Sequence, residues 1–310
     1  VSERRFQSKR NGQWVKGKSA ETFGPLGPWL VTTDELDPSN LAMELKVDGR
    51  QVYAATGGRP FDAAKPLVIF IHGAGQDHTN WQLPARWFAW NGYAVLAPDL
   101  PGHGRSDGPP LETIQDMAQW IGRLMDAANV KRAGLVGHSM GGGIAVEAAA
   151  ALPDRISRVA LLGTSLSMPV NDTLLAAARD APEQAHQMIT AWSHGPRAKV
   201  GGNPAPGLWM SGGTMALLGR NRPGTLHAAF NACNLWKSGP DAAQRVRCPA
   251  LVMIGASDSM TPPKIGRALA DKIAGSRTVT IPNSGHMMMY EAPDAVLDAL
   301  IEFFRTDVRG

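Results

Sequence analysis

The stretch Gly137-His138-Ser139-Met140-Gly141 decides the fold of this 310-residue chain. It directly follows an apolar run, residues 133–136, and directly precedes an Ala-rich segment, residues 139–151. A G-x-S-x-G run between a strand and a helix places a serine on a sharp turn at the end of a buried strand. Glycines flank such a turn because neighbouring backbone comes close to it. The stretch therefore predicts a strand, a tight turn carrying Ser139, and a helix.

Short apolar runs alternate with longer helical segments on both sides of this turn. Residues 41–47 and 51–55, joined across Asp48-Gly49, predict an entry hairpin. The predicted buried strands are residues 67–71, 94–97, 133–136, 159–162, 250–254 and 278–281, and the clearest helices are residues 113–127, 139–151, 263–274 and 293–304. Such alternation predicts an α/β fold, in which helices cover both faces of a mostly parallel sheet.

The segment between the strands that end near Leu162 and begin near Ala250 is too long for a loop. Its helical pattern is broken by a Gly/Pro-rich run at residues 195–213. We expect residues 165–240 to form a helical cap inserted into a catalytic domain made of residues 41–164 and 241–310. Residues 1–40 do not join the alternation and form an N-terminal extension.

A serine hydroxyl is a weak nucleophile unless a base stands beside it and a carboxylate orients that base. His286 is the candidate base, because it follows the last predicted strand in a loop that can reach back over the sheet. Asp258 is the candidate acid, because it lies just past the strand at residues 250–254. Asp99 and Glu291 are the nearest rivals of Asp258. We expect Asp99 to organise its own loop and Glu291 to start the last helix.

An acyl-transfer site also needs N–H donors for the oxyanion. We assign this role to the backbone N–H groups of Ala74 and Met140, with Gly73 as the fallback in the loop His72-Gly73-Ala74-Gly75. Candidate pocket residues lie in this loop, at the serine turn, in the cap and beside the base: His72, Gly73, His138, Trp192, Trp209, Met210 and Met287. Other apolar candidates are Trp81, Trp87, Met215 and Phe230.

Five motifs, from residue 41 onward and in this order, resemble the α/β-hydrolase superfamily. They are H-G-A-G at residues 72–75, D-L-P-G-H-G-R-S at 99–106, G-H-S-M-G-G at 137–142, Asp258, and G-H at 285–286. The resemblance implies an eight-stranded-type sheet with an inserted cap. It also implies hydrolysis, and a serine at the turn favours esters over the substrates of dehalogenases and epoxide hydrolases, whose nucleophile is an aspartate.

We therefore predict a serine carboxylesterase that acts on small to medium esters through an acyl-enzyme. One alternative is a carbon-carbon hydrolase of aromatic ring-fission products, although those enzymes typically place a tryptophan after the base, where this chain has Met287. Others are acyl transfer to an alcohol and a non-catalytic protein that binds a small ligand.

Residues 1 to about 50 are similar to a segment of the fumarylacetoacetate hydrolase family. The similarity rests on the runs at residues 14–18, 22–32 and 37–40. That family uses a divalent metal, but only Lys18 carries over as a possible site residue, so we expect no metal here. We interpret the segment as a fused fragment, and its apolar stretch at residues 23–31 offers a route to a homo-oligomer.

Composition narrows the class of partner. The net charge of +4 is small for this length and the basic residues are mostly scattered, so we expect no nucleic-acid partner. No run approaches the roughly 20 apolar residues that span a bilayer. The two cysteines, Cys233 and Cys248, lack the spacing of a metal or redox motif. We expect a soluble cytoplasmic protein with a small-molecule ester as substrate, no membrane partner and no cofactor.

Overall fold

The computed structural model describes residues 45–200 and 209–305. The chain divides after Glu44, and the hydrolase-like unit begins at Leu45. The N-terminal extension, with Lys18 and the apolar stretch at residues 23–31, lies outside the described residues.

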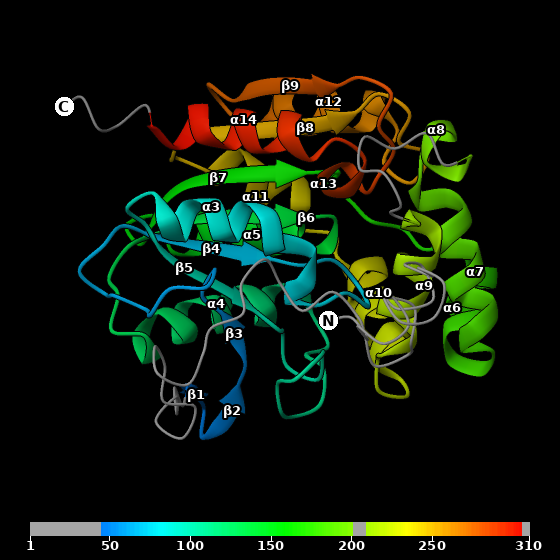
Figure 1. Ribbon diagram of the computed structural model, residues 1–310, viewed down its shortest axis with the longest axis horizontal. Helices are drawn as coiled ribbons and strands as arrows, with labels where there is room; N and C mark the ends of the chain where they lie inside the picture. Colours follow the sequence, from blue (N-terminus) through cyan, green and yellow to red (C-terminus); the bar gives the residue numbers. More distant parts are fainter. Residues whose placement is uncertain (1–44, 201–208, 306–310) are drawn as a thin grey trace, which may run out of the picture. The chain divides into compact units, whose positions relative to one another are not determined.

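A seven-stranded sheet forms the centre of the described unit (Figure 1). Its strands, in spatial order, are β3 (Ala54–Ala55), β5 (Ala94–Pro98), β4 (Leu67–Ile71), β6 (Ala133–His138), β7 (Ile156–Leu162), β8 (Ala250–Gly255) and β9 (Arg277–Ile281). Only β3 runs antiparallel to its neighbour; the other described pairs are parallel. The expected eighth strand is absent from this sheet within the described residues, because β1 (Leu45–Val47) and β2 (Arg50–Val52) pair with each other as a separate hairpin.

Helices cover both faces of the sheet (Figure 1). One face carries α3 (Gln82–Trp90) and α14 (Pro293–Arg305); the other carries α4 (Ile114–Ala127), α5 (Met140–Ala151), α11 (Gly239–Arg245) and α12 (Pro263–Lys272). Successive side chains of a strand point to opposite faces. In β4, Ile69 accordingly joins the core beneath α4 and α5, and Phe70 joins the core beneath α3 and α14. Burial on both sides explains why this strand is apolar at every position.

Between β7 and β8 the chain is helical, and its described helices before α11 lie at the carboxyl ends of the strands (Figure 1). These helices are α6 (Asp172–Asp180), α7 (Pro182–Ser193), α8 (Pro196–Lys199), α9 (Met210–Gly219) and α10 (Thr225–Leu235). The side chain of Asn171 caps α6 by accepting from the Leu174 N–H at 2.8 Å. Ile189, Leu218 and Phe230 belong to a separate apolar cluster that holds these helices together. The segment thus has its own small core above the edge of the sheet.

The observed elements differ from the expected ones mainly at their ends. Thr113, for example, stands before α4 rather than within it, because its hydroxyl accepts from the Asp116 N–H at 3.0 Å and caps the helix. The helices α3, α11 and the short α13 (Met288–Glu291) were not expected. Pro84 and several aromatic residues obscured the helical pattern of α3.

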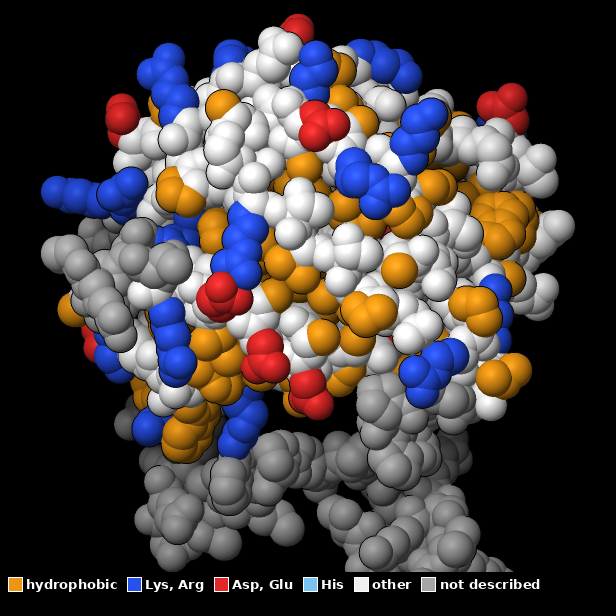
Figure 2. Space-filling view, turned by 90° about the horizontal axis from the view of Figure 1, so that it is seen from above, with side chains coloured by type: hydrophobic (Ala, Val, Ile, Leu, Met, Phe, Trp, Pro, Cys, Tyr) orange, Lys and Arg blue, Asp and Glu red, His pale blue; other side chains and the backbone are white. Residues whose placement is uncertain are grey.

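None of the helices in the described ranges is long and apolar enough to span a membrane. Figure 2 looks onto the β9 edge of the sheet, with α12 and α14 on either side of that strand. Basic and acidic side chains are intermixed there with small apolar areas, and neither sign of charge gathers into a stripe. This face therefore offers no large patch of one charge.

Candidate active site

Ser139 sits on the turn between β6 and α5 with φ of 54° and ψ of −117°. Side-chain-bearing residues rarely adopt a positive φ, so surrounding contacts must hold the serine there. The Ser139 N–H donates to the Leu162 carbonyl of β7 at 2.9 Å, and its own carbonyl accepts from the Thr164 hydroxyl at 2.8 Å. The strained turn is therefore fastened to the neighbouring strand.

The glycines of the turn are required by close backbone approach. A Cβ added at Gly137 would lie 2.2 Å from the carbonyl oxygen of Gly141. A Cβ added at Gly141 would lie 2.2 Å from the carbonyl oxygen of Ile71, the last residue of β4. Neither contact can be relieved by rotating a side chain, because both neighbours are backbone atoms.

His286 lies in the loop between β9 and α13, and Asp258 follows β8. The structure brings the two together: His286 Nδ1 is 2.8 Å from Asp258 Oδ2, and both residues are 3% exposed. The second carboxylate oxygen of Asp258 accepts from the N–H groups of Met260 at 2.9 Å and Thr261 at 2.8 Å. These donors fix the carboxylate, so its free oxygen faces the imidazole.

Ser193, the last residue of α7, holds the backbone of His286 from the side of the inserted helices. The Ser193 carbonyl accepts from the N–H of His286 at 2.9 Å and from that of Met287 at 3.1 Å. Behind the ring, His138 Nε2 lies 3.0 Å from the His286 carbonyl. Burial, and secondly the nearby His286, hold the pKa of His138 well below its usual range, so His138 is neutral at pH 7. The loop of His286 is therefore held from both sides.

Two backbone N–H groups are available near Ser139. Ala74 lines the cavity that contains Ser139, and Met140 is the first residue of α5. Within the described part of the chain, neither N–H has a hydrogen-bond acceptor. The N–H of Gly73, by contrast, donates to Gln76 Oε1 at 2.9 Å. The occupied N–H of Gly73 therefore favours Ala74 over Gly73 for the oxyanion.

Ser139 and His286 open onto one cavity of about 30 Å³ beneath the inserted helices. Its walls come from the loop after β4, from α7, α9 and α10, and from the loops of Asp258 and His286: Ala74, Gln76, Ile189, Ser193, Thr214, Leu217, Leu218, Phe230, Met260 and Met287. Most of the wall is apolar, and the lining residues include no lysine or arginine.

Of the expected pocket residues, Met287 and Phe230 line this cavity and the others do not. Burial places Trp81 in the core against Phe70, with ring centroids 5.4 Å apart. Trp209 precedes α9 and is 77% exposed, so it faces solvent. The remaining expected residues that lie elsewhere are His72, Gly73, His138, Trp87, Trp192, Met210 and Met215.

His72 shows why a motif residue need not line the pocket. Its side chain is fully buried, and its Nε2 accepts from the Leu100 N–H at 3.0 Å. Burial lowers the pKa of His72, which keeps the ring a neutral acceptor. His72 thus joins the loops that follow β4 and β5.

Asp99 organises its own loop, as expected. Its Oδ1 accepts from the His78 N–H at 2.7 Å, and its Oδ2 accepts from the Arg105 N–H at 2.9 Å. Asp77, His78 and Asp99 also form the one group of potential metal ligands within residues 45–200 and 209–305. Asp77 is paired with Arg220 at 2.9 Å, and His78 Nδ1 with Asp99 at 2.8 Å. The group is therefore satisfied by protein partners.

Glu291 does not start the last helix, so that expectation is wrong. It ends α13, and its Oε2 accepts from the N–H groups of Gly285 at 3.0 Å and Gly195 at 2.9 Å. Gly285 precedes His286, and Gly195 follows α7. Glu291 therefore joins the loop of the candidate base to the inserted helices.

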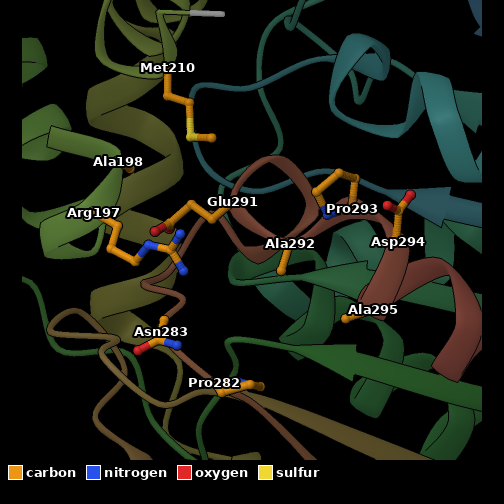
Figure 3. Close-up of a pocket in the computed structure, with 10 residues that line it drawn as sticks. All are labelled: Arg197, Ala198, Met210, Pro282, Asn283, Glu291, Ala292, Pro293, Asp294 and Ala295. Atoms are coloured by element: carbon orange, nitrogen blue, oxygen red, sulfur yellow. The ribbon is translucent and has the colours of Figure 1, made fainter. Parts of the chain in front are cut away.

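A larger cavity of about 310 Å³ has Glu291 in its wall (Figure 3). Arg197 and Glu291 extend toward one another across it, and Asn283 and Asp294 contribute further polar groups. Ser139 and His286 do not line it. It adjoins α8, and residues 201–208, which follow α8, lie outside the described residues. We assign it no role.

Three polar residues of the cavity were not anticipated from the sequence, Gln76, Ser193 and Thr214, and neither were four apolar ones, Ile189, Leu217, Leu218 and Met260. Gln76 directly follows the H-G-A-G loop, which was a usable signal. Ser193 and Thr214 lie in helices whose faces were not assigned to the cavity.

Comparisons with known proteins agree with this arrangement. Residues 68–299 match the model of the Alpha/beta hydrolase family. Residues 1–68 match the Fumarylacetoacetate (FAA) hydrolase C-terminal model, which extends past the expected fragment into the start of β4.

The individual relatives differ in the share of each chain that the alignment covers. The chain is 44% identical over 119 residues to the dihydrolipoyllysine-residue acetyltransferase component of the acetoin cleaving system of Cupriavidus necator, covering 37% of this chain and only 30% of that protein. It is 26% identical to the (E)-2-((N-methylformamido)methylene)succinate hydrolase of Acinetobacter baylyi, covering 78% and 91% of the two chains. The enol-lactonase of Burkholderia xenovorans LB400 superposes with a TM-score of 0.74 at 26% identity, covering 83% and 98%.

The family match covers most of the chain, and it coincides with the sheet, the serine turn and the loops of Asp258 and His286. This chain therefore belongs to the alpha/beta hydrolase family.

Proposed function

We propose that this protein is a serine hydrolase of carboxylic esters, with Ser139, His286 and Asp258 as its catalytic triad. One observation carries the proposal: Ser139, on a strained turn, and His286, paired with a buried Asp258 at 2.8 Å, open onto the same cavity. A nucleophile, a base and a group that orients the base are the parts that acyl transfer requires.

Ser139 Oγ attacks the ester carbonyl while His286 Nε2 takes its proton. Asp258 accepts from Nδ1–H, which keeps Nε2 unprotonated and ready to act as base. His286 then gives the proton to the leaving alkoxide, and the acyl-enzyme forms. Water, activated by the same histidine, releases the acid.

The N–H groups of Ala74 and Met140 stabilise the oxyanion. Both lack a hydrogen-bond acceptor in the described chain, and the Met140 N–H lies at the positive end of the twelve-residue helix α5. Preorganised donors of this kind typically contribute a factor of about 10² to 10³ in kcat each.

The enol-lactonase relationship supports the ester class, because a lactone is a cyclic ester. The small cavity supports short acyl groups over long ones. The helices of residues 165–240 act as a cap that excludes bulk water from Ser139.

A carbon-carbon hydrolase is the second candidate. It rests on the fumarylacetoacetate hydrolase match at residues 1–68, because that family and the ring-fission hydrolases both belong to aromatic catabolism. A serine triad and an oxyanion site would serve either reaction, so the substrate must discriminate between them.

The test is a hydrolysis screen of p-nitrophenyl esters of rising chain length beside one ring-fission dienoate, with wild type and Ser139→Ala. We expect ester turnover that falls by about 10³-fold or more in Ser139→Ala. Ser157→Ala is the matched control, because Ser157 is a half-buried serine of β7. Ester turnover that survives in Ser139→Ala refutes the proposal, and turnover of the dienoate alone replaces it with the second candidate.

Labelling by a fluorophosphonate separates catalysis from simple binding. An activated Ser139 reacts with the probe, and the label maps to the peptide that contains it. A protein that only binds small ligands leaves the probe intact.

A further inference from the structure

Three polar side chains besides Ser139 and His286 interrupt the apolar wall of the cavity, and the hydroxyl of one of them, Thr214, is hydrogen-bonded to His194 Nε2 at 2.8 Å. The other two are Gln76 and Ser193. Gln76 comes from the loop after β4, and Ser193 is the last residue of α7. Both lie beside the base: the Gln76 Nε2 contacts Met287 Sδ at 3.4 Å, and the Ser193 carbonyl accepts from the N–H of His286 and of Met287. Gln76 and Ser193, which belong to different elements, therefore both contact Met287.

The amide of Gln76 has a defined orientation. Its Oε1 accepts from the Gly73 N–H at 2.9 Å and from the amide of Asn80, and it lies 3.1 Å from His138 Nδ1. A backbone N–H can only donate, so rotating the amide would place its NH₂ against a donor. Nε2 is thus turned to Met287, whose thioether is a weak acceptor. The cavity consequently contains an N–H donor that lacks a strong acceptor.

Ser193 supplies the second unsatisfied group. It is 1% exposed, and its Oγ has no hydrogen-bond partner among the described residues. A buried hydroxyl without a partner is unfavourable compared with one that is hydrogen-bonded. A ligand atom that bonds to Oγ would remove this penalty.

The charge of the cavity restricts what that atom can be. No lysine or arginine lines it, and a carboxylate desolvated without a cation is strongly disfavoured. An uncharged carbonyl oxygen accepts from both Gln76 Nε2 and Ser193 Oγ without that penalty. Gln76 belongs to the same loop as Ala74, which places this oxygen in the acyl part of the substrate.

We propose that Gln76 and Ser193 bind a second, uncharged carbonyl oxygen in the acyl group, so that this enzyme prefers oxo-acyl esters to saturated esters of equal length. The inference rests on the proposed ester hydrolase. It names the substrate class of that site.

The test compares the p-nitrophenyl esters of 4-oxopentanoate and pentanoate, and of 5-oxohexanoate and hexanoate. For wild type we expect kcat/KM to favour the better oxo ester about tenfold, because a neutral hydrogen bond contributes a factor of about five to ten. The preference should fall to about twofold or less in Ser193→Ala. An equal preference in Ser193→Ala, or none in wild type, overturns the inference.

Thr190→Val is the matched control. Thr190 lies in the same helix, and its hydroxyl is also buried and unpartnered, but it does not line the cavity. Its loss should leave the preference unchanged. Gln76→Glu keeps an oxygen for the Gly73 N–H while it removes the donor, and it should lose the preference as Ser193→Ala does. If Gln76→Glu does not fold, the oxo-ester preference of Ser193→Ala alone tests the inference.

Binding separates this inference from the catalytic proposal. In Ser139→Ala protein we expect 4-oxopentanamide to bind several-fold tighter than pentanamide, as measured by ligand-observed NMR, and the difference to vanish when Ser193→Ala is added. Ester turnover with no oxo preference refutes the inference alone. Absent ester turnover refutes the proposed function, and equal binding of the two amides then refutes the inference as well.

Discussion

The Nδ1 atom of His194 lies 4.0 Å from the Oε1 atom of Glu291, and both side chains are buried behind the loop of His286. Neither atom has a hydrogen-bond partner within the described residues. Burial raises the pKa of Glu291 and lowers that of His194 to about 4, so the His194 ring is neutral at pH 7. Glu291 Oε2 meanwhile holds the N–H groups of Gly195 and Gly285. Glu291 is therefore a positioning residue for His286.

The substitutions Glu291→Gln and Glu291→Ala should differ in their effects on stability and on kcat. Glutamine keeps an oxygen for the two N–H groups, so we expect the free energy of unfolding to change by less than about 1 kcal/mol. Alanine leaves two buried N–H groups unpaired, and we expect a loss of about 2–4 kcal/mol together with a lower kcat. Urea unfolding and ester kinetics measure the two effects.

Glu302→Gln provides the control for Glu291. Glu302 is an exposed residue of α14 whose ion pair with Arg277 is 2.8 Å long, and such pairs contribute little. Equal behaviour of Glu291→Gln and Glu291→Ala would show that the two backbone hydrogen bonds do not hold the loop.

The strands of the sheet were predictable because their burial is a local signal. Leu67–Ile71 was predicted with its observed bounds, since five apolar residues closed by His-Gly suit a strand covered on both faces. The turn of Ser139 was also predictable, because close backbone approach at this turn requires glycines that can be recognised in the sequence. Asp258 and His286 follow β8 and β9, where the fold gathers strand ends.

Contacts between distant segments were not predictable in the same way. The bond of Glu291 to Gly195 and the role of Ser193 depend on how the inserted helices fold back over the sheet. Trp209 was expected in the pocket because it is an aromatic residue of the inserted segment. It directly precedes α9 and is exposed to solvent, which the sequence alone does not show. Periodicity shows which residues are apolar, and packing decides which of them face the cavity.

Asp258→Asn should impair catalysis through the tautomer of His286. The N–H groups of Met260 and Thr261 require an oxygen at the Oδ1 position, so the amide of asparagine would face the imidazole. Nδ1 then accepts, Nε2 carries the proton, and the base is blocked. We expect kcat for the ester to fall by about 10³ to 10⁴ with little change in melting temperature. A modest loss would mean that Asp258 does not set the tautomer.

His103 should make the protein sensitive to acid. Its Nε2 is buried without a partner in the described chain, and burial, with His72 as the second cause, lowers its pKa to about 3. Between about pH 3 and the ordinary value of 6.5, the unfolded state binds the proton that the folded state lacks. The free energy of unfolding therefore falls as pH falls through this window, by about 1.4 kcal/mol per pH unit for this residue.

His103→Asn removes that contribution. Urea unfolding at pH 4.5, 5.5, 6.5 and 8 should give a shallower fall for the variant than for wild type, and a constant difference above pH 7. Other buried histidines, among them His72 and His138, act in the same direction, so the variant keeps part of the slope. Parallel curves for the two proteins would contradict the assignment.

Gly141→Ala and Gly213→Ala should change stability in opposite directions. A Cβ at Gly141 meets the carbonyl oxygen of Ile71 at 2.2 Å, so backbone must shift, and we expect a loss of about 1–3 kcal/mol together with loss of ester turnover. Gly213 lies exposed in α9 with nothing within 4 Å of an added Cβ. Alanine there should raise stability by about 0.5–1 kcal/mol, because glycine weakens a helix interior. If Gly141→Ala kept full turnover, close packing of the serine turn against β4 would not be what holds Ser139 in place.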